Sequence, residues 1–407
     1  MKVLVFAHIP PPHHGQSYMV KMLLENLGKA EPGTDELILY HVNAQLSETM
    51  DDVGSWRLGK LFLLLRYILQ AWALRWEHSP DALYYVPAPA KRSAVYRDWL
   101  VLLLVAPFFR VRIFHWHSIG LGQWVTESAT QGWRRRREAA ITRWLLSENE
   151  LSVVLDDYGR RDVETFSPRR VAVVPNGIPD PCPDFESSLL RERLRRRGDR
   201  MEPRAGQPPP FELLYLAHAT RTKGLFDTVD AVAAANARLA AEKSLERIRL
   251  TVAGAFVDRE EEAAFRERLQ RDDLALATED GPERAVVYAG YVEPKEKDRL
   301  LRTCDALCFA SHFPNEGQPV SIIEALAYGM PVLLSRWRGL PGMVPSPLAH
   351  LAEPRDAASV AQALPLLFDE GRFAEFRQVF LDRYSLASHC RGMREAILSV
   401  DPLKGGD

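Results

Sequence analysis

Two glutamates, Glu316 and Glu324, stand in the stretch that most constrains the fold of this chain, residues 311–337. The segment before Glu316 is polar and contains a proline, which indicates a loop. Pro319 suits the first turn of a helix, where its missing N–H needs no partner. Apolar residues then recur at helical spacing until Gly329, after which the apolar run PVLL predicts a buried strand.

This pattern places the amino terminus of a helix between two carboxylates. We expect Glu316 in the loop that enters the helix and Glu324 about two turns inside it. Free N–H groups and the helix dipole make a helix amino terminus an anion site. Carboxylates on either side of it could bind hydroxyl groups while the backbone binds phosphate, a combination that a sugar nucleotide requires.

The first part of the chain alternates predicted strands and helices. Residues 2–8 read as a buried strand, and after a loop that contains Gly15, residues 18–27 show the spacing of an amphipathic helix. This alternation indicates a doubly wound α/β domain, and Gly15 would let a ligand approach the backbone closely. No G-x-G-x-x-G or Walker sequence occurs, which argues against a dinucleotide oxidoreductase or a P-loop enzyme. Further strands are predicted at 36–42, 83–86, 111–116, 151–155 and 171–174.

The second part repeats the pattern after a segment of different composition, which is rich in proline and arginine and predicts an exposed linker around a short helix. Strand-like runs follow at 212–217, 249–253, 286–289, 306–310 and 332–335. We therefore predict a first α/β domain at 1–180, the linker at 181–210, a second α/β domain at 211–385, and a last helical segment, 386–407, that crosses back to the first domain.

Cationic and imidazole side chains follow predicted strands, at the sheet edge where ligands bind in such domains. Arg221 and Lys223 stand in the loop after one strand, where two cations could meet a diphosphate. His115 and His117 end another strand and share its parity, so both could face the same side. The position of His117 nearer the loop favours a functional role, whereas a structural role for His115 is equally open. A metal site is not expected, because the pair lacks a third ligand.

Composition excludes several classes of protein. The net charge of −2 provides no field that would attract nucleic acid. Four scattered cysteines are too few for a disulfide framework. The first apolar run is shorter than the core of a signal peptide, and no window reaches the roughly 18 apolar residues of a spanning helix. We therefore expect a cytoplasmic protein, or one bound peripherally to the inner face of the cytoplasmic membrane.

Two very apolar helices, predicted at 57–76 and 91–108, have two readings. They could pack on the parallel sheet as ordinary core helices. Alternatively, the Trp, Tyr and Arg residues that decorate them, together with the four arginines at 134–137, suit peripheral contact with an anionic membrane. Successive arginines are also common on a solvated face, so both readings stay open.

Taken together and in this order, the motifs resemble the retaining glycosyltransferases of family 4, within glycosyl transferases group 1. The resemblance extends over nearly the whole chain, and the two-glutamate stretch is its most specific part. It implies a GT-B fold, in which two Rossmann-like domains with doubly wound parallel sheets face a cleft. The motifs are PPHHGQS after the first strand, HWHS at 115–118, VPNGI at 174–178, RTKG at 221–224, and EGQP with EALAYGMPV at 316–332.

The resemblance implies two catalytic residues. Glu316 would contact the donor sugar, and His117 would position the reacting groups near it. No D-x-D sequence occurs, in keeping with metal-independent transfer. No cofactor is expected, since a UDP- or GDP-linked sugar would be the substrate.

A larger set of residues would hold the donor. In this set Glu324 would bind the ribose hydroxyls and the two cations the diphosphate, while the loop glycine would admit the phosphates. The expected donor-binding residues are Gly15, Gln16, Arg221, Lys223, Gly317, Gln318, Pro319, Val320 and Glu324. Candidate contacts with acceptor or sugar are His14, His115 and Asn176. Three positions depart from the family pattern, where His14, His218 and Gly342 replace a glycine, an arginine and a glutamate.

The implied function is that of a hexosyltransferase in polysaccharide or glycoconjugate biosynthesis. It would move a hexose from a nucleotide diphosphate sugar to a glycan or lipid-linked acceptor with retention, the leaving phosphate taking the acceptor proton. A GT-B epimerase or phosphorylase is a rival, although those enzymes lack this glutamate stretch. A second rival is a catalytically inactive subunit that binds nucleotide sugars or acts as a scaffold in a glycan-assembly complex, and the intact motifs argue against it.

Overall fold

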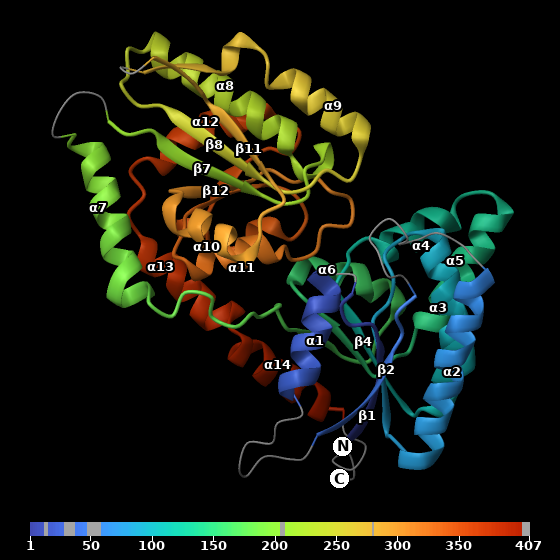
Figure 1. Ribbon diagram of the computed structural model, residues 1–407. Coiled ribbons are helices and arrows are strands. Elements are labelled where there is room, and N and C mark those ends of the chain that lie inside the picture. The colour runs from blue at the N-terminus through green and yellow to red at the C-terminus, as the bar shows by residue number, and fades with distance from the viewer. Residues whose placement is uncertain (12–14, 28–36, 47–57, 204–207, 279–280, 401–407) are drawn as a thin grey trace. The chain divides into compact units, whose positions relative to one another are not determined.

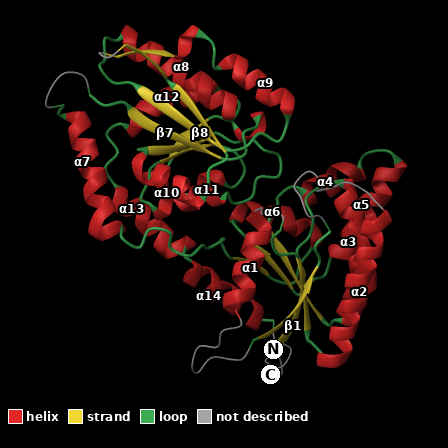
Figure 2. Ribbon diagram, in the orientation of Figure 1, coloured by secondary structure: helices red, strands yellow, loops and turns green. Residues whose placement is uncertain are grey.

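The chain forms two compact units, as seen in a computed structural model that describes residues 1–11, 15–27, 37–46, 58–203, 208–278 and 281–400. One unit consists of residues 1–178 and 386–407, and the other of residues 179–385. In each unit a parallel sheet forms the middle layer and helices cover both of its faces (Figure 1, Figure 2). This architecture confirms the predicted fold class, with two doubly wound parallel-sheet α/β domains.

The sheet of the first unit has the strand order β2-β1-β3-β4-β5-β6, and all its pairings are parallel. The order changes direction between β1 and β3, since β2 lies on one side of β1 and the later strands lie on the other. Such a topological switch point is where open α/β sheets bind ligands. The strands are β1 (Lys2–Ala7), β2 (Ile38–Asn43), β3 (Ala82–Tyr85), β4 (Val111–Trp116), β5 (Leu151–Val154) and β6 (Val171–Val173).

Successive side chains along the strands of this sheet point to opposite faces, so a hydrophobic core forms on each face. Leu4 and Phe6 enter one core, whereas Val3 and Val5 enter the other. The first core is covered by α2 (Leu58–His78), α3 (Arg92–Val105), α4 (Leu121–Ala129), α5 (Trp133–Leu146) and α6 (Asp157–Val163). The second is covered by α1 (Gly15–Leu27) and by α14 (Leu386–Leu398), the last helix of the chain. Short turns extend α3 and α6 as η1 (Ala106–Phe108) and η2 (Glu164–Phe166).

The sheet of the second unit has the strand order β11-β8-β7-β12-β13-β14, again with every pairing parallel. Its switch point lies between β7 and β12. The strands are β7 (Phe211–Leu216), β8 (Ile248–Ala253), β11 (Val286–Gly290), β12 (Ala306–Phe309), β13 (Val332–Ser335) and β14 (His350–Ala352), and a separate antiparallel pair is formed by β9 (Ala275–Thr278) and β10 (Gly281–Arg284).

Helices cover this sheet on both faces (Figure 2). They are α7 (Leu190–Met201), α8 (Leu225–Ala241), α9 (Arg259–Arg268), α10 (Pro294–Thr303), α11 (Val320–Ala327), α12 (Ala357–Ala363) and α13 (Phe373–Val379). Single turns are η3 (Phe185–Leu189), η4 (Arg221–Lys223), η5 (Asp272–Leu274), η6 (Leu340–Met343), η7 (Ser346–Leu348), η8 (Leu364–Leu367) and η9 (Phe380–Tyr384). Among the helices in the described ranges, none combines the length and the hydrophobicity needed to cross a bilayer.

The prediction of an exposed linker at 181–210 is wrong for residues 181–201. Residues up to Met201 belong to the second unit, which begins at Pro179, and most of them are helical. The Arg193 guanidinium of α7 is 2% exposed and donates hydrogen bonds to the carbonyls of Leu301, Cys304 and Tyr328, at 2.6, 3.0 and 2.9 Å. These carbonyls lie at the carboxyl ends of α10 and α11, where helices leave such groups without an internal partner.

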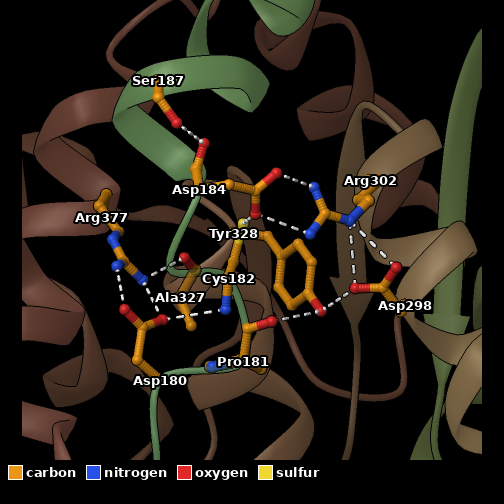
Figure 3. A network of polar contacts seen from close by, with 10 residues as sticks. All are labelled: Asp180, Pro181, Cys182, Asp184, Ser187, Asp298, Arg302, Ala327, Tyr328 and Arg377. Atoms are coloured by element: carbon orange, nitrogen blue, oxygen red, sulfur yellow. Dashed lines mark hydrogen bonds and ion pairs between the residues drawn. The ribbon is translucent and has the colours of Figure 1, made fainter.

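Arginines also fasten the start of this segment to the second unit (Figure 3). The Arg377 guanidinium on α13 donates to both carboxylate oxygens of Asp180, at 2.8 and 2.5 Å. The Arg302 guanidinium on α10 donates to Asp184 at 2.8 and 3.0 Å and to Asp298 at 3.0 and 3.1 Å. Within this segment Arg193 thus donates to carbonyls at helix ends, while the aspartates at its start pair with arginines of α10 and α13, because a guanidinium can satisfy several acceptors at once.

Candidate active site

The loops that follow β7 and β12 meet at the switch point of the second unit. The backbone N–H of His312 donates to the carbonyl of Thr222 at 2.8 Å, which joins the two loops. Gly224 adopts a positive φ of 77°, and a Cβ there would lie 2.2 Å from the carbonyl oxygen of Ala310. Glycine is required at this close approach, so the local backbone holds the Lys223 loop against the Glu316 loop.

Lys223 and Glu316 form an ion pair at this junction. The Lys223 ammonium donates to both carboxylate oxygens of Glu316, each at 2.8 Å. The Ser311 hydroxyl donates to the same carboxylate, and Glu316 is only 4% exposed. The ring of Phe313 lies 4.9 Å from the ammonium. A carboxylate fixed in this way has a defined direction for accepting a hydroxyl group, and the ammonium beside it can bind an anion.

The amino terminus of α11 adjoins this ion pair in the sequence. Helix α11 begins at Val320, and its N-cap residue, Pro319, provides no side-chain cap. Gly317 and Gln318, which lead into it, are buried. The first N–H groups of the helix and its dipole therefore add positive potential next to Lys223.

Glu324 lies farther along α11 and is also paired with a lysine. The Lys297 ammonium on α10 donates to Oε1 of Glu324 at 2.5 Å. The carboxylate retains a second oxygen and partial exposure, so it can still accept hydrogen bonds from hydroxyl groups. Lys297 was not predicted as a site residue, because a lysine within a predicted polar helix carries no distinguishing signal in the sequence.

Arg221 does not join the Lys223–Glu316 pair. Its guanidinium lies 3.9 Å from the ring centroid of Phe226, and its backbone N–H donates to Glu261 at 3.2 Å. It lines an open pocket of about 620 Å³ together with Asp258, Glu260 and Glu261. Of the two cations that the sequence singles out, only Lys223 is therefore brought to the glutamate.

In the first unit, the predicted histidines lie at the end of β4. His115 is 1% exposed, and its Nδ1 is hydrogen-bonded to the Tyr84 hydroxyl. The ring of His117, which is partly exposed, lies 4.1 Å from it between centroids. Burial, and then the neighbouring His117 and His389, lower the pKa of His115 well below its usual value. A buried, neutral His115 fits the structural reading, whereas the His117 side chain is partly exposed, with its Nε2 atom buried.

His389 on α14 completes a row of three histidines that the sequence did not reveal. Its ring stacks 6.4 Å from that of His115, and its Nδ1 is 2.6 Å from the carbonyl of Pro175. Asn176, next to that carbonyl, is buried. The sequence predicted that the last helical segment crosses back to the first domain, and the fold shows that His389 of α14 packs at this edge of the first sheet.

The remaining candidates of the first unit lie near the start of α1. Gly15 is exposed as the first residue of that helix, and Gln16 follows it. Gln16 lines a small cavity together with Ala7 and Tyr85, the last residues of β1 and β3. His14 lies outside the described residues. Within the described ranges, no group of three or more His, Cys, Asp or Glu side chains is placed to hold a metal ion.

Comparison with protein families gives one match. Residues 200–380 match the family model described as glycosyl transferases group 1. The matched range contains the Lys223–Glu316 pair, Glu324 and Lys297. No curated protein matches the sequence significantly.

Solved structures share the fold over almost the whole chain. HepE from Anabaena, in complex with UDP, has a TM-score of 0.62 at 15% identity, covering 98% of this chain and 100% of its own. Sucrose-phosphate synthase from Thermosynechococcus elongatus has a TM-score of 0.63 at 16% identity, with 98% and 99% covered. The lipopolysaccharide outer core galactosyltransferase WaaB has a TM-score of 0.64 at 13% identity, again with 98% and 99% covered. The chain thus has the two-domain GT-B fold of these structures, and residues 200–380 match glycosyl transferases group 1.

Proposed function

We propose that this protein is a retaining, metal-independent glycosyltransferase that moves a hexose from a UDP- or GDP-linked sugar to a glycan or lipid-linked acceptor. One observation carries the proposal. A lysine and a buried glutamate pair at the switch point, beside the uncapped amino terminus of α11, within the range that matches glycosyl transferases group 1. This arrangement offers positive charge for a diphosphate and a fixed acceptor for a sugar hydroxyl.

In the proposed complex, the diphosphate lies between Lys223 and the first N–H groups of α11. It competes with Glu316 for the Lys223 ammonium, which releases the Glu316 carboxylate to accept a hydroxyl of the donor sugar. Glu324, which keeps one oxygen beyond its contact with Lys297, binds the ribose hydroxyls. The nucleotide and the sugar are thus held at two fixed carboxylates, with the phosphates between them.

Charge development explains why the cation matters for the reaction. As the bond between the sugar and the diphosphate breaks, negative charge grows on the leaving phosphate and positive charge on the sugar ring. Lys223 and the α11 dipole stabilise the phosphate, and Glu316 stabilises the oxocarbenium-like sugar. These groups supply the charge that a metal ion supplies in other transferases, which supports metal-independent transfer.

Retention follows, in this proposal, from displacement on the same face of the sugar. The acceptor hydroxyl transfers its proton to the leaving phosphate oxygen as its own oxygen bonds to the anomeric carbon. His117 positions the reacting groups and does not act as a committed base. Its partial exposure at the end of β4 supports access to substrate, in contrast to the buried His115.

The similar structures support a nucleotide-sugar donor. HepE has been solved with UDP and glucose and with UDP-glucose, and WaaB is a galactosyltransferase by its description. We extend these donor and reaction classes to this chain as part of the proposal. We further propose that the protein works in the cytoplasm, in peripheral contact with the membrane that would carry a lipid-linked acceptor.

Donor turnover without acceptor tests the function. Purified protein is incubated with a panel of UDP- and GDP-sugars, with and without EDTA, and nucleotide release is measured alongside thermal stabilisation. We expect one donor to stabilise the fold and to release its nucleotide at the same rate in EDTA. Stabilisation without any release would indicate an inactive binding subunit, and release abolished by EDTA would contradict metal independence.

A further inference from the structure

The outer surface of the first unit carries apolar side chains where a solvated surface would be polar. Helix α2 buries Leu64 and Ile68 against the sheet, yet its opposite side presents Phe62, Leu69 and Trp76, which are 72%, 59% and 67% exposed. These positions recur at helical spacing, so they form a stripe along the helix. A helix that is apolar on both sides requires a partner for its outer side.

Exposed apolar side chains also occur on the neighbouring helices. Helix α3 contacts both α2 and α5, and the three helices lie side by side on one face of the sheet (Figure 1). The exposed ring of Phe108, just after α3, lies 5.9 Å from that of Trp76. On α5, Trp133 and Trp144 are exposed as well. We call the outer sides of α2, α3 with η1, and α5 the outer helical face.

Positive charge is concentrated on these helices. Within their bounds α2, α3 and α5 hold ten Lys and Arg residues and three Asp and Glu residues, a net charge of +7, whereas the whole chain carries −2. Two of the three acidic side chains are already engaged, because Asp98 is buried against Arg97 and Glu138 pairs with Arg92. The exposed Arg134 and Arg137 guanidinium groups lie 5.4 and 5.2 Å from the ring of Trp133.

We infer that the outer helical face docks on the surface of a bilayer that contains anionic lipids. Exposed aliphatic and aromatic side chains would enter the boundary between headgroups and acyl chains, while the arginines bind lipid phosphates. A second copy of this chain would bring a net charge of +7 against the same charge, which disfavours a symmetric dimer through this face. A nucleic acid could match the charge, but it offers no hydrocarbon to cover Phe62 and Leu69.

Vesicle binding tests the inference. The full chain is mixed with vesicles of phosphatidylcholine alone or of phosphatidylcholine with phosphatidylglycerol, and the bound fraction is measured by flotation together with tryptophan fluorescence. We expect binding only to the anionic vesicles, with a blue shift of the fluorescence and weaker binding at high salt. Equal lack of binding to both vesicles would overturn the inference, as would concentration-dependent dimerisation through this face or binding of an oligonucleotide in place of vesicles.

Two matched pairs of variants localise the surface. Leu69→Ser/Trp76→Ser should reduce binding to anionic vesicles at least tenfold, whereas Tyr291→Ser/Leu366→Ser, at comparably exposed positions of the second unit, should leave it unchanged. Arg135→Gln/Arg136→Gln should weaken binding by about five-fold for each arginine removed. Its control is Arg195→Gln/Arg266→Gln, at two exposed positions of the second unit. Equal effects of variants and controls would contradict the assigned face.

The assay needs no donor and no transfer, so this inference and the proposed glycosyltransferase activity fail separately. If the protein turns over a nucleotide sugar but does not bind anionic vesicles, the docking surface and the proposed membrane contact are both wrong, and the proposed transfer reaction stands. A protein that binds the vesicles but turns over no donor loses only the enzymatic proposal. Circular dichroism and thermal midpoints of each variant show whether the fold is retained.

Discussion

At the scale of single residues, the site depends on lysines that neutralise glutamates. Glu316 is nearly inaccessible and has Lys223 and Ser311 as partners, while Glu324 has Lys297. A carboxylate that accepts hydrogen bonds from such partners is held in one orientation. The two glutamates are therefore better suited to binding and orientation than to acid–base catalysis.

Replacing Glu316 tests this assignment. Glu316→Gln keeps the shape of the side chain but removes its charge and replaces one acceptor oxygen with a donor NH2 group, so it should lower the rate of nucleotide release by about 10²-fold or more. The matched control is Glu353→Gln, which alters a more exposed carboxylate of the same unit, paired with Arg336. A Glu316→Gln enzyme that turns over donor at the normal rate would remove Glu316 from the site.

Removing Lys223, the partner of Glu316, should lower the stability of the fold more than Glu316→Gln does. Lys223→Met leaves the carboxylate of Glu316 buried without its cation, which should cost about 3 kcal/mol of the free energy of unfolding. The double variant Lys223→Met/Glu316→Gln should recover most of that loss, since no buried charge remains unpaired. Urea denaturation of the four proteins in this cycle measures the coupling, and strictly additive effects would argue against the pair.

At the scale of elements, arginines hold helix ends together in the second unit. Arg193 on α7 donates to three carbonyls at the ends of α10 and α11. Arg193→Ala should therefore cost about 3 kcal/mol or more, because it leaves buried carbonyls unsatisfied. Arg195→Ala, two positions along the same helix and largely exposed, should change stability by about 0.5 kcal/mol or less. Similar denaturation midpoints for the two variants would contradict the capping role.

Hydrogen bonds of Glu370 with His350 and Arg372 connect β14 to the start of α13, and they depend on pH. Glu370 is buried, which by itself raises its pKa, but hydrogen bonds from Arg372 and His350 outweigh burial and lower the pKa to about 2. Because the folded pKa lies below the ordinary value of 4.5, the carboxylate stabilises the fold above pH 4.5. This contribution is lost as the pH falls toward 2.

The difference in thermal midpoint between the wild type and Glu370→Gln measures this contribution of Glu370. We expect the wild type to have the higher thermal midpoint at pH 6 and the difference to shrink steadily between pH 4.5 and 2. A difference that stays constant over that range would show that ionisation of Glu370 does not stabilise the fold. Glu353→Gln, which changes an exposed carboxylate of the same unit, serves as the control.

At the scale of the whole molecule, the strands and helices with a regular pattern of apolar residues could be predicted from the sequence. Apolar runs identified the central strands and amphipathic spacing identified α1 and α11, because burial forces a period on the sequence. The short edge strand β14 escaped prediction, since three residues are too few to show a period. The buried Arg193 and the ion-paired Asp184 were assigned to an exposed linker, because composition alone cannot show which charged side chains find partners.

The candidate site was predictable to a similar degree. Glu316, Glu324 and Lys223 were found because their loops carry motifs, and the fold joins Lys223 to Glu316. Lys297, beside Glu324, and His389, beside His115, were missed because each reaches its neighbour only through packing, from a helix with no motif of its own. Arg221 was expected beside Lys223, but its stacking on Phe226 directs it to the pocket with Glu261.

The central claim is that Lys223, beside Glu316, binds the diphosphate of a nucleotide sugar. Isothermal titration of UDP and GDP into the wild type, Lys223→Gln and Arg238→Gln tests it most directly, since Arg238 is a partly exposed cation near the far end of α8. We predict that the wild type and Arg238→Gln bind one of the two nucleotides equally well, and that Lys223→Gln binds it at least tenfold more weakly. Undiminished binding to Lys223→Gln, or no binding of either nucleotide to the wild type, would contradict the claim.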